Sequence, residues 1–225
     1  DKNNVVEFVD AESFAENLEK MSRTALIPYP NKLDVKDGEL PLASLSAIAY
    51  TSAGMKEHAE AFARQLGIST GISLEVKEAG DAPSLGEIWF GTDETIAKEA
   101  YTMSVTSEGI TVQASEFGGW FYALQTLKQL MPRNFFAGDK QSDAGAWTIP
   151  CLEIEDRPHL GHRGYMLDIA RHFFNKEEVK KVLDIMALLP QLPGTTANLN
   201  QLQNKTWVAT KIGNAALITN PSERN

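Results

Sequence analysis

The chain has 225 residues, of which 43% are hydrophobic and 23% charged, and its formal net charge at pH 7 is -9. This composition is typical of a globular protein with one or two domains, and the negative charge argues against a nucleic-acid partner. The single cysteine, Cys151, excludes an internal disulfide and a thiolate metal cluster, and no apolar run reaches the roughly 18 residues of a membrane span.

Residues 1–24 are interpreted as an amino-terminal extension with one short helix. The first ten residues, DKNNVVEFVD, are too charged for a signal peptide, although a leader could have been removed before them. Residues 10–21 place Phe14, Leu18 and Met21 at helical spacing, which predicts a short amphipathic helix.

Residues 25–132 are predicted to form one α+β domain. Leu33 and Val35 alternate with charged residues before a turn at Asp37-Gly38, and further strands are expected at 45–51, 73–78 and 86–92. Between them, apolar residues at helical spacing predict a helix over 55–66 that Gly67 ends.

The surest local signal is a β-hairpin over 101–115, in which apolar residues alternate on both sides of a Ser107-Glu108-Gly109 turn. The next segment, EFGGWFYALQTLKQLMP, predicts a helix that Pro132 ends. Together these elements favour a small, mostly antiparallel sheet with helices on one face.

Residues 133–156 are rich in turn formers and predict a linker with one short strand near 147–154. The acidic residues Glu153, Glu155 and Asp156 are interpreted as part of this solvated linker and not as a catalytic acid and base, because they precede the next folded unit.

Residues 157–189 predict one strand, a loop and a helix. The strand GYMLDIA ends in a loop that holds Asp168, Arg171 and His172, and Asn175 with Glu178 forms a capping box for the helix. A guanidinium at the carboxyl end of a strand could bind sugar hydroxyls or a carboxylate, with Asp168 orienting it. The alternatives are a structural Asp168–Arg171 ion pair and a packing role for His172.

The string RGYMLDIARHFFNKEEVKKVLDIMALL, residues 163–189, resembles the start of the catalytic barrel of family 20 glycoside hydrolases, the β-N-acetylhexosaminidases. The segment before it, with IPYP, the hairpin and GGWFYALQTLKQLMP, is similar to the small domain that precedes that barrel. The resemblance covers about residues 25–189 and implies a (β/α)₈ barrel.

The resemblance implies that Arg171 binds ring hydroxyls of a terminal N-acetylhexosamine, with Asp168 and His172 in supporting roles and Arg163 and Gly164 at the start of the first barrel strand. It implies no cofactor or metal, and an N-acetylhexosamine glycan as substrate. In the family's mechanism the substrate's acetamide oxygen attacks the anomeric carbon; an Asp orients that group and a neighbouring Glu protonates the leaving oxygen.

Residues 190–225 depart from this pattern, since they contain no aspartate, no histidine and no His-Trp-His run. A complete barrel takes about 250 residues. We therefore expect a truncated chain without its catalytic Asp-Glu pair, inactive alone, with an atypical tail. Within the tail, 207–219 could form a hairpin or stay a loop.

Two functional hypotheses follow from the residues and the resemblance. The first is the amino-terminal portion of an exo-acting β-N-acetylhexosaminidase, exported to the periplasm, cell surface or medium. The second is a noncatalytic binding or interaction module derived from that family. In either case an incomplete barrel exposes apolar surface, which favours self-association.

Overall fold

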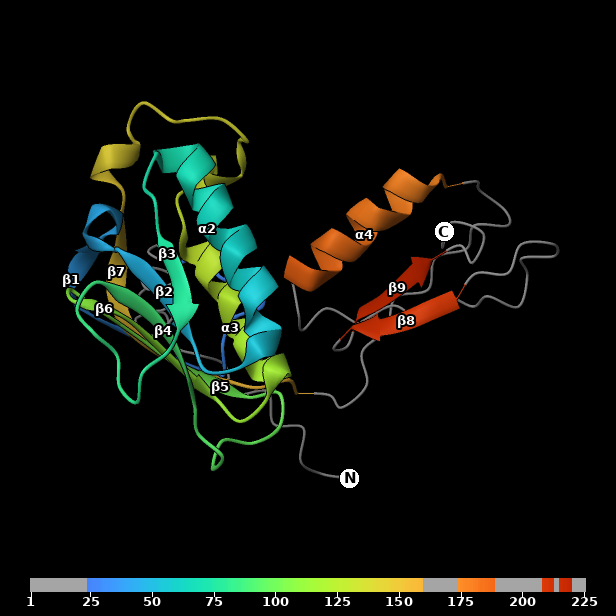
Figure 1. The fold of residues 1–225 in the computed structure, drawn as a ribbon, viewed down its shortest axis with the longest axis horizontal. Helices are drawn as coiled ribbons and strands as arrows, with labels where there is room; N and C mark the ends of the chain where they lie inside the picture. Colours follow the sequence, from blue (N-terminus) through green and yellow to red (C-terminus); the bar gives the residue numbers. More distant parts are fainter. Residues whose placement is uncertain (1–23, 160–173, 189–207, 213–214, 220–225) are drawn as a thin grey trace, which may run out of the picture.

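The fold was taken from a computed structural model that describes residues 24–159, 174–188, 208–212 and 215–219. Figure 1 shows a small domain with one sheet and two helices, beside which lie a third helix and a two-stranded sheet. The helix predicted at 10–21 and the strand predicted at 164–170 lie outside the described residues.

The small domain is built on a seven-stranded sheet with the order β1-β7-β5-β6-β4-β2-β3. Its strands are, in chain order, β1 Lys32–Pro41, β2 Ala47–Tyr50, β3 Glu75–Glu78, β4 Glu87–Thr92, β5 Tyr101–Thr106, β6 Gly109–Ala114 and β7 Thr148–Asp156. Short 3-10 helices occupy Leu42–Ser44, Ala53–Met55, Arg133–Phe136 and Ala144–Ala146.

The α+β class is confirmed, but the sheet is mixed and not mostly antiparallel. The pairs β1·β7, β5·β7 and β5·β6 are antiparallel, whereas β4·β6, β2·β4 and β2·β3 are parallel. The reason is the helix between β2 and β3: a helical crossover returns the chain to the same edge, so the two strands that it joins run parallel.

Two predicted boundaries are wrong for reasons of backbone conformation. β1 does not turn at Asp37-Gly38 but continues through a bulge, with a register shift between Val35 and Glu39 and φ of 99° at Gly38. The second helix, α2 Lys56–Thr70, runs through Gly67 and ends at Gly71, whose φ of 81° provides the left-handed cap.

The two long helices of the domain cover one face of the sheet (Figure 1). α2 contacts β2 and β3, and α3, Phe117–Leu130, contacts β5 and β6. Gly119 of α3 permits this close approach, because a Cβ there would lie 2.2 Å from the carbonyl oxygen of Ala100. The side chains of Trp120, Leu124 and Leu127, which share one face of α3, are buried.

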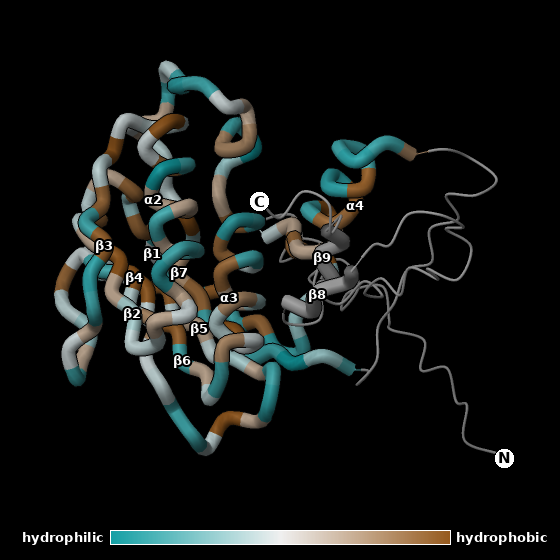
Figure 2. Tube along the Cα trace, turned by 45° about the vertical axis from the view of Figure 1, so that its right-hand side comes forward, coloured by the Kyte–Doolittle hydropathy of each residue, from teal (hydrophilic) through white to brown (hydrophobic). Residues whose placement is uncertain are grey.

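The predicted hairpin is confirmed with the alternation that defined it. Met103 pairs with Val112 and Val105 with Ile110, and all four side chains are buried in the core between the sheet and the helices. Figure 2 shows hydrophobic segments concentrated in these strands and polar segments in the outer turns. Cys151 of β7 is free and buried.

The strand expected within the 133–156 linker is an integral part of the sheet. β7 pairs with β1 on one side and β5 on the other, and Ile149, Leu152 and Ile154 are buried. This part of the predicted linker therefore belongs to the small domain. The sequence signal was weakened by Pro150, which a sheet tolerates here at the register shift of β1.

The carboxyl-terminal third contributes α4, Lys176–Leu188, and a hairpin of β8, Val208–Ile212, and β9, Ala215–Thr219. Of the two alternatives for 207–219, the hairpin is therefore the observed one. Among the helices that the structure describes, none is long and apolar enough to cross a bilayer.

Candidate functional site

The residues predicted to bind sugar, Arg171 with Asp168 and His172, lie outside the described residues, as do Arg163 and Gly164. The structure describes the two ends that bracket this loop, namely the chain up to His159 and the chain from Phe174. The geometry below is that of these two flanks.

A buried tyrosine holds the end of β7, where the chain leaves the small domain. The Tyr101 hydroxyl lies 2.7 Å from the Thr126 hydroxyl and 3.5 Å from Oδ2 of Asp156. The backbone amide of Asn31 donates to Oδ1 of Asp156 at 3.1 Å. Burial, reinforced by the Asp156 carboxylate, raises the pKa of Tyr101, so the phenol stays protonated. The Asp156 carboxylate thus contacts two separate segments, at Asn31 and at Tyr101.

The other flank begins with the predicted capping box, which the structure confirms. The Glu178 amide donates to Oδ1 of Asn175 at 2.9 Å, and the Asn175 amide donates to the Glu178 carboxylate at 2.8 Å. These two reciprocal bonds satisfy backbone amides at the helix start, which have no carbonyl acceptor within the helix. They fix the residue at which α4 begins, Lys176, three positions after residue 173.

α4 meets the small domain at its carboxyl end, against α3 (Figures 1 and 2). The Gln129 side-chain amide donates to the Leu188 carbonyl at 3.0 Å. The neighbouring Lys128 is partly buried; burial lowers its pKa, and the Asp184 carboxylate acts in the opposite direction. Sequence reasoning missed this contact, because Gln129 is a polar residue outside the apolar stripe of α3 and carries no local signal of a partner.

His58 of α2 lies against the aromatic residues of α3. Its ring centroid is 5.4 Å from that of Phe117 and 5.2 Å from that of Phe121. Burial and the charge of Lys128 lower the pKa of His58, against a smaller opposing effect of Glu57. The imidazole is therefore held neutral near pH 7 in an aromatic setting, which suits packing better than proton transfer.

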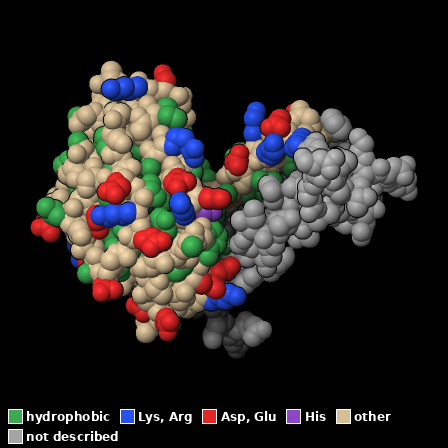
Figure 3. All heavy atoms as spheres, in the orientation of Figure 1, with side chains coloured by type: hydrophobic (Ala, Val, Ile, Leu, Met, Phe, Trp, Pro, Cys, Tyr) green, Lys and Arg blue, Asp and Glu red, His purple; other side chains and the backbone are tan. Residues whose placement is uncertain are grey.

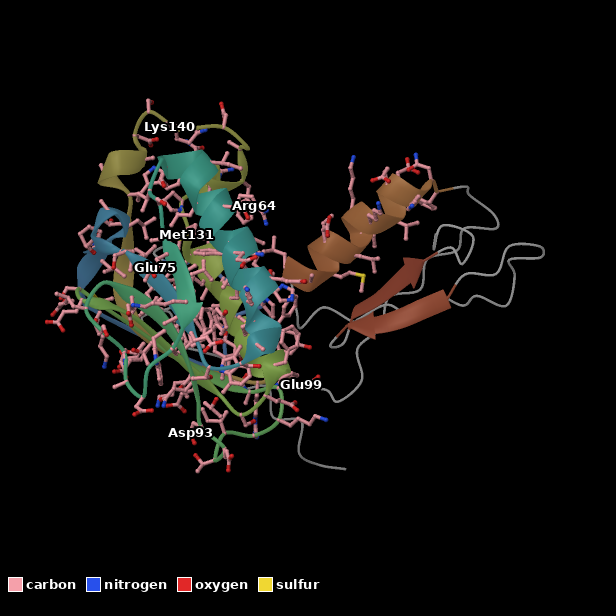
Figure 4. All side chains as sticks on the ribbon, in the orientation of Figure 1. Arg64, Glu75, Asp93, Glu99, Met131 and Lys140 are labelled. Atoms are coloured by element: carbon pink, nitrogen blue, oxygen red, sulfur yellow. The ribbon has the colours of Figure 1, made fainter. Side chains whose placement is uncertain are left out.

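The acidic residues of β7 do not form a catalytic pair. Glu155 contacts Lys32 at 2.5 Å, and Glu153 lies 3.7 Å from Lys36, all four side chains being exposed. Other charged residues lie apart: Figure 4 shows Asp93 and Glu99 at one end of the domain and Lys140 at the other. Figure 3 shows both signs of charge interspersed over the visible face. Within the described ranges, no group of three His, Cys, Asp or Glu residues could hold a metal.

Comparison with known proteins divides the chain at the same place. The family model for glycosyl hydrolase family 20, domain 2, matches residues 23–157, and the model for the catalytic domain of that family matches residues 160–190. The segment with Arg171 therefore lies inside the second match.

Curated relatives cover the same region. A β-hexosaminidase of Porphyromonas gingivalis is 33% identical over 165 residues, which are 72% of this chain and 21% of the relative. The N,N'-diacetylchitobiase of Vibrio harveyi is 31% identical over 199 residues, or 83% of this chain and 20% of the relative. The chain thus spans about a fifth of each of these two proteins.

Solved structures give the same result. The GH20 β-N-acetylhexosaminidase of Streptomyces coelicolor A3(2) superposes with a TM-score of 0.62 at 28% identity, covering 74% of this chain and 33% of that one. The GH20 exo β-N-acetylglucosaminidase of Vibrio harveyi gives 0.61 at 26% identity, covering 77% and 25%. Because the domain 2 model alone accounts for more than half of the residues, the chain belongs to glycosyl hydrolase family 20.

Proposed function

We propose that the chain is the amino-terminal portion of an exo-β-N-acetylhexosaminidase that removes terminal N-acetylglucosamine or N-acetylgalactosamine from glycans. The observation that carries the proposal is the succession of the two family matches, domain 2 over 23–157 followed directly by the start of the catalytic domain over 160–190. The names of the relatives, hexosaminidases and a chitobiase, support the substrate class.

In this proposal Arg171 binds ring hydroxyls of the terminal sugar, with Asp168 and His172 supporting its orientation. A planar guanidinium presents several N–H groups in a fixed fork, which suits adjacent hydroxyl oxygens. Catalysis is substrate-assisted and retaining: the substrate's acetamide oxygen forms a bond to the anomeric carbon as the bond to the leaving oxygen breaks and a Glu delivers its proton.

The Asp and Glu of that mechanism have no matching positions in residues 190–225, which contain no aspartate and a single glutamate, Glu223. We therefore propose that the 225-residue chain does not turn over substrate by itself. We further propose that the parent enzyme is exported, because glycans with terminal N-acetylhexosamines are abundant outside the cytoplasm.

A second candidate is a noncatalytic interaction module, and the exposure of α4 favours it. α4 has an apolar stripe yet no buried residue, and Ile185 is 57% exposed. A stripe of this kind is normally covered in a folded protein. In this alternative the chain self-associates or binds a partner through α4.

A chromogenic N-acetylglucosaminide tests the first proposal. We expect no turnover by the 225-residue chain, and turnover by a protein whose sequence continues past Leu189 into a complete barrel. In that longer protein, Arg171→Ala should lower kcat/KM about 10-fold to 100-fold, the range for losing charged hydrogen bonds to the sugar.

Three results would contradict the proposals. A longer protein that hydrolyses no N-acetylhexosaminide would overturn the function. Turnover by the 225-residue chain that Arg171→Ala abolishes would overturn its inactivity. For the interaction module, light scattering decides: a monomer at every concentration tested would exclude self-association through α4.

A further inference from the structure

The carboxyl end of α4 lacks the groups that normally stabilise a helix end. The last four carbonyls of a helix have no donor within the helix, and the negative end of the helix dipole favours a nearby cation. The last turn of α4 contains no basic residue, and the charged residue just before it is the acidic Asp184. Stabilising groups for this end therefore have to come from another part of the protein.

α3 supplies a hydrogen-bond donor to this end, and a lysine precedes that donor in the sequence. The Gln129 side chain donates to the carbonyl of Leu188, the final residue of α4, at 3.0 Å. Lys128, the preceding residue, is near enough to Asp184 for the carboxylate to oppose the lowering of the Lys128 pKa by burial. The side-chain amide of Gln129 thus donates to the final carbonyl of α4, whereas the Lys128 ammonium donates to Gln125 of its own helix.

The oxygen of the Gln129 side-chain amide accepts a hydrogen bond from a third segment. The backbone amide of Ile27 donates to Oε1 of Gln129 at 2.9 Å. Ile27 lies 102 positions before Gln129 and Leu188 lies 59 positions after it. One side chain therefore connects the start of the small domain, α3 and the carboxyl end of α4, and it uses its acceptor on one side and its donor on the other.

We propose that Gln129 is a positioning residue that caps α4 from the small domain and so holds the first helix of the catalytic region in place. In the sequence, α4 begins three positions after residue 173, the end of the segment with Asp168, Arg171 and His172. The meaning of this cap for sugar binding rests on the function proposed above.

The cap is tested by hydrogen exchange of the full 225-residue chain with three variants. Gln129→Glu keeps the acceptor for Ile27 but places a carboxylate at the negative end of α4. Gln129→Lys keeps a donor for the Leu188 carbonyl and adds a favourable charge. Gln65→Glu makes the same chemical change on α2, at a side chain for which the described residues offer no hydrogen bond.

We expect the amides of Val179–Leu188 to exchange about fivefold faster in Gln129→Glu, the factor for one net hydrogen bond, and at the wild-type rate in Gln129→Lys and Gln65→Glu. Amides of β5 and β6 report on whether each variant is folded. Amides of α3 reveal any effect of the new charge on its own carboxyl end.

Unchanged exchange of α4 in Gln129→Glu would overturn the proposal, and so would equal acceleration by Glu and Lys, because a cap must distinguish the two charges. No sugar enters this experiment. Failure of the cap therefore leaves the hexosaminidase proposal intact, and failure of the chromogenic assay leaves the cap intact.

Discussion

Helices α3 and α4 have 14 and 13 residues and both carry an apolar stripe, yet they differ completely in burial. Eight of the residues of α3 are buried, whereas α4 has none. α3 lies between the sheet and other helices; α4 contacts the small domain through its carboxyl end. The comparison teaches that an apolar stripe predicts a helix but not how far the helix is buried. Burial depends on which other elements pack against it.

The largest expected effect comes from shortening one apolar side chain in each helix. Leu124→Ala removes a side chain that is 1% exposed, and should lower the free energy of unfolding by about 2 to 5 kcal/mol. Val182→Ala removes a partly exposed stripe residue of α4 and should cost less than about 1 kcal/mol. Urea unfolding of both variants measures the difference. Equal losses would mean that α4 shares the core of the small domain.

A second pair of variants tests the close approach of α3 to the sheet. A Cβ on Gly119 would lie 2.2 Å from the Ala100 carbonyl oxygen and 2.6 Å from the Ala114 side chain, so Gly119→Ala should cost about 1 to 3 kcal/mol. At Gly118 the nearest atom is 3.3 Å away, in the flexible Glu99 side chain. There the helix preference of alanine should stabilise the protein by up to about 1 kcal/mol.

Thermal unfolding of these two glycine variants gives opposite signs for neighbouring residues. A stabilised Gly119→Ala variant would show that α3 is free to move away from the sheet. α3 would then resemble α4 in depending little on its contacts.

Much of the small domain could be predicted from the sequence because its elements are defined by local patterns. The hairpin follows from strict alternation around Ser107-Glu108-Gly109, and α4 follows from its Asn175–Glu178 capping box; both are confirmed. The sheet's parallel pairs and the place of β7 between β1 and β5 could not be predicted, because pairing depends on residues far apart in the sequence.

The candidate site was predictable only through the family resemblance. Spacing alone left Asp168 and Arg171 as either a sugar site or a structural ion pair, and the roles of Arg171, Asp168 and His172 remain predictions. What the sequence did not reveal was the flanking support. Neither the Tyr101–Asp156 contact nor the Gln129–Leu188 contact has a local signal, since each joins residues more than 50 positions apart.

Tyr101→Phe tests the support of the chain where it leaves the small domain. The substitution removes the hydroxyl near Thr126 and Asp156 without a large cavity, so it should cost about 1 to 2 kcal/mol. Tyr50→Phe is the control, because Tyr50 is also buried in the sheet but has no hydroxyl partner among the described residues. Chemical denaturation compares the two. Equal effects would mean that the hydroxyl contacts contribute nothing.

Asn175→Ala acts on α4 alone and therefore isolates the less buried helix. Loss of an N-cap typically costs about 1 kcal/mol, here confined to the first turn of α4. Hydrogen exchange should be faster for Glu178 and its neighbours, with the urea midpoint of the small domain unchanged. A lowered midpoint would show that the two regions unfold together.

The smallest expected effect concerns His58, on the outer side of the helix layer. Burial and Lys128 hold the pKa of His58 below its ordinary value of 6.5, with Glu57 opposing. The unfolded chain therefore binds a proton more readily than the folded one, so the contribution of His58 to stability is complete above pH 6.5 and is lost as the pH falls from there toward the folded pKa.

His58→Gln removes the titration of the imidazole, whereas the carboxylates of the protein titrate as before. The difference in unfolding free energy between wild type and His58→Gln should thus shift against the wild type between pH 7.5 and 5.5. Lys128→Met adds a sharper comparison, because it removes the nearby cation and so should weaken the pH dependence that remains with His58. If the difference in unfolding free energy between wild type and His58→Gln did not depend on pH, the His58 imidazole would be accessible to water. The contact between α2 and α3 would then be as solvent-exposed at this point as α4 is.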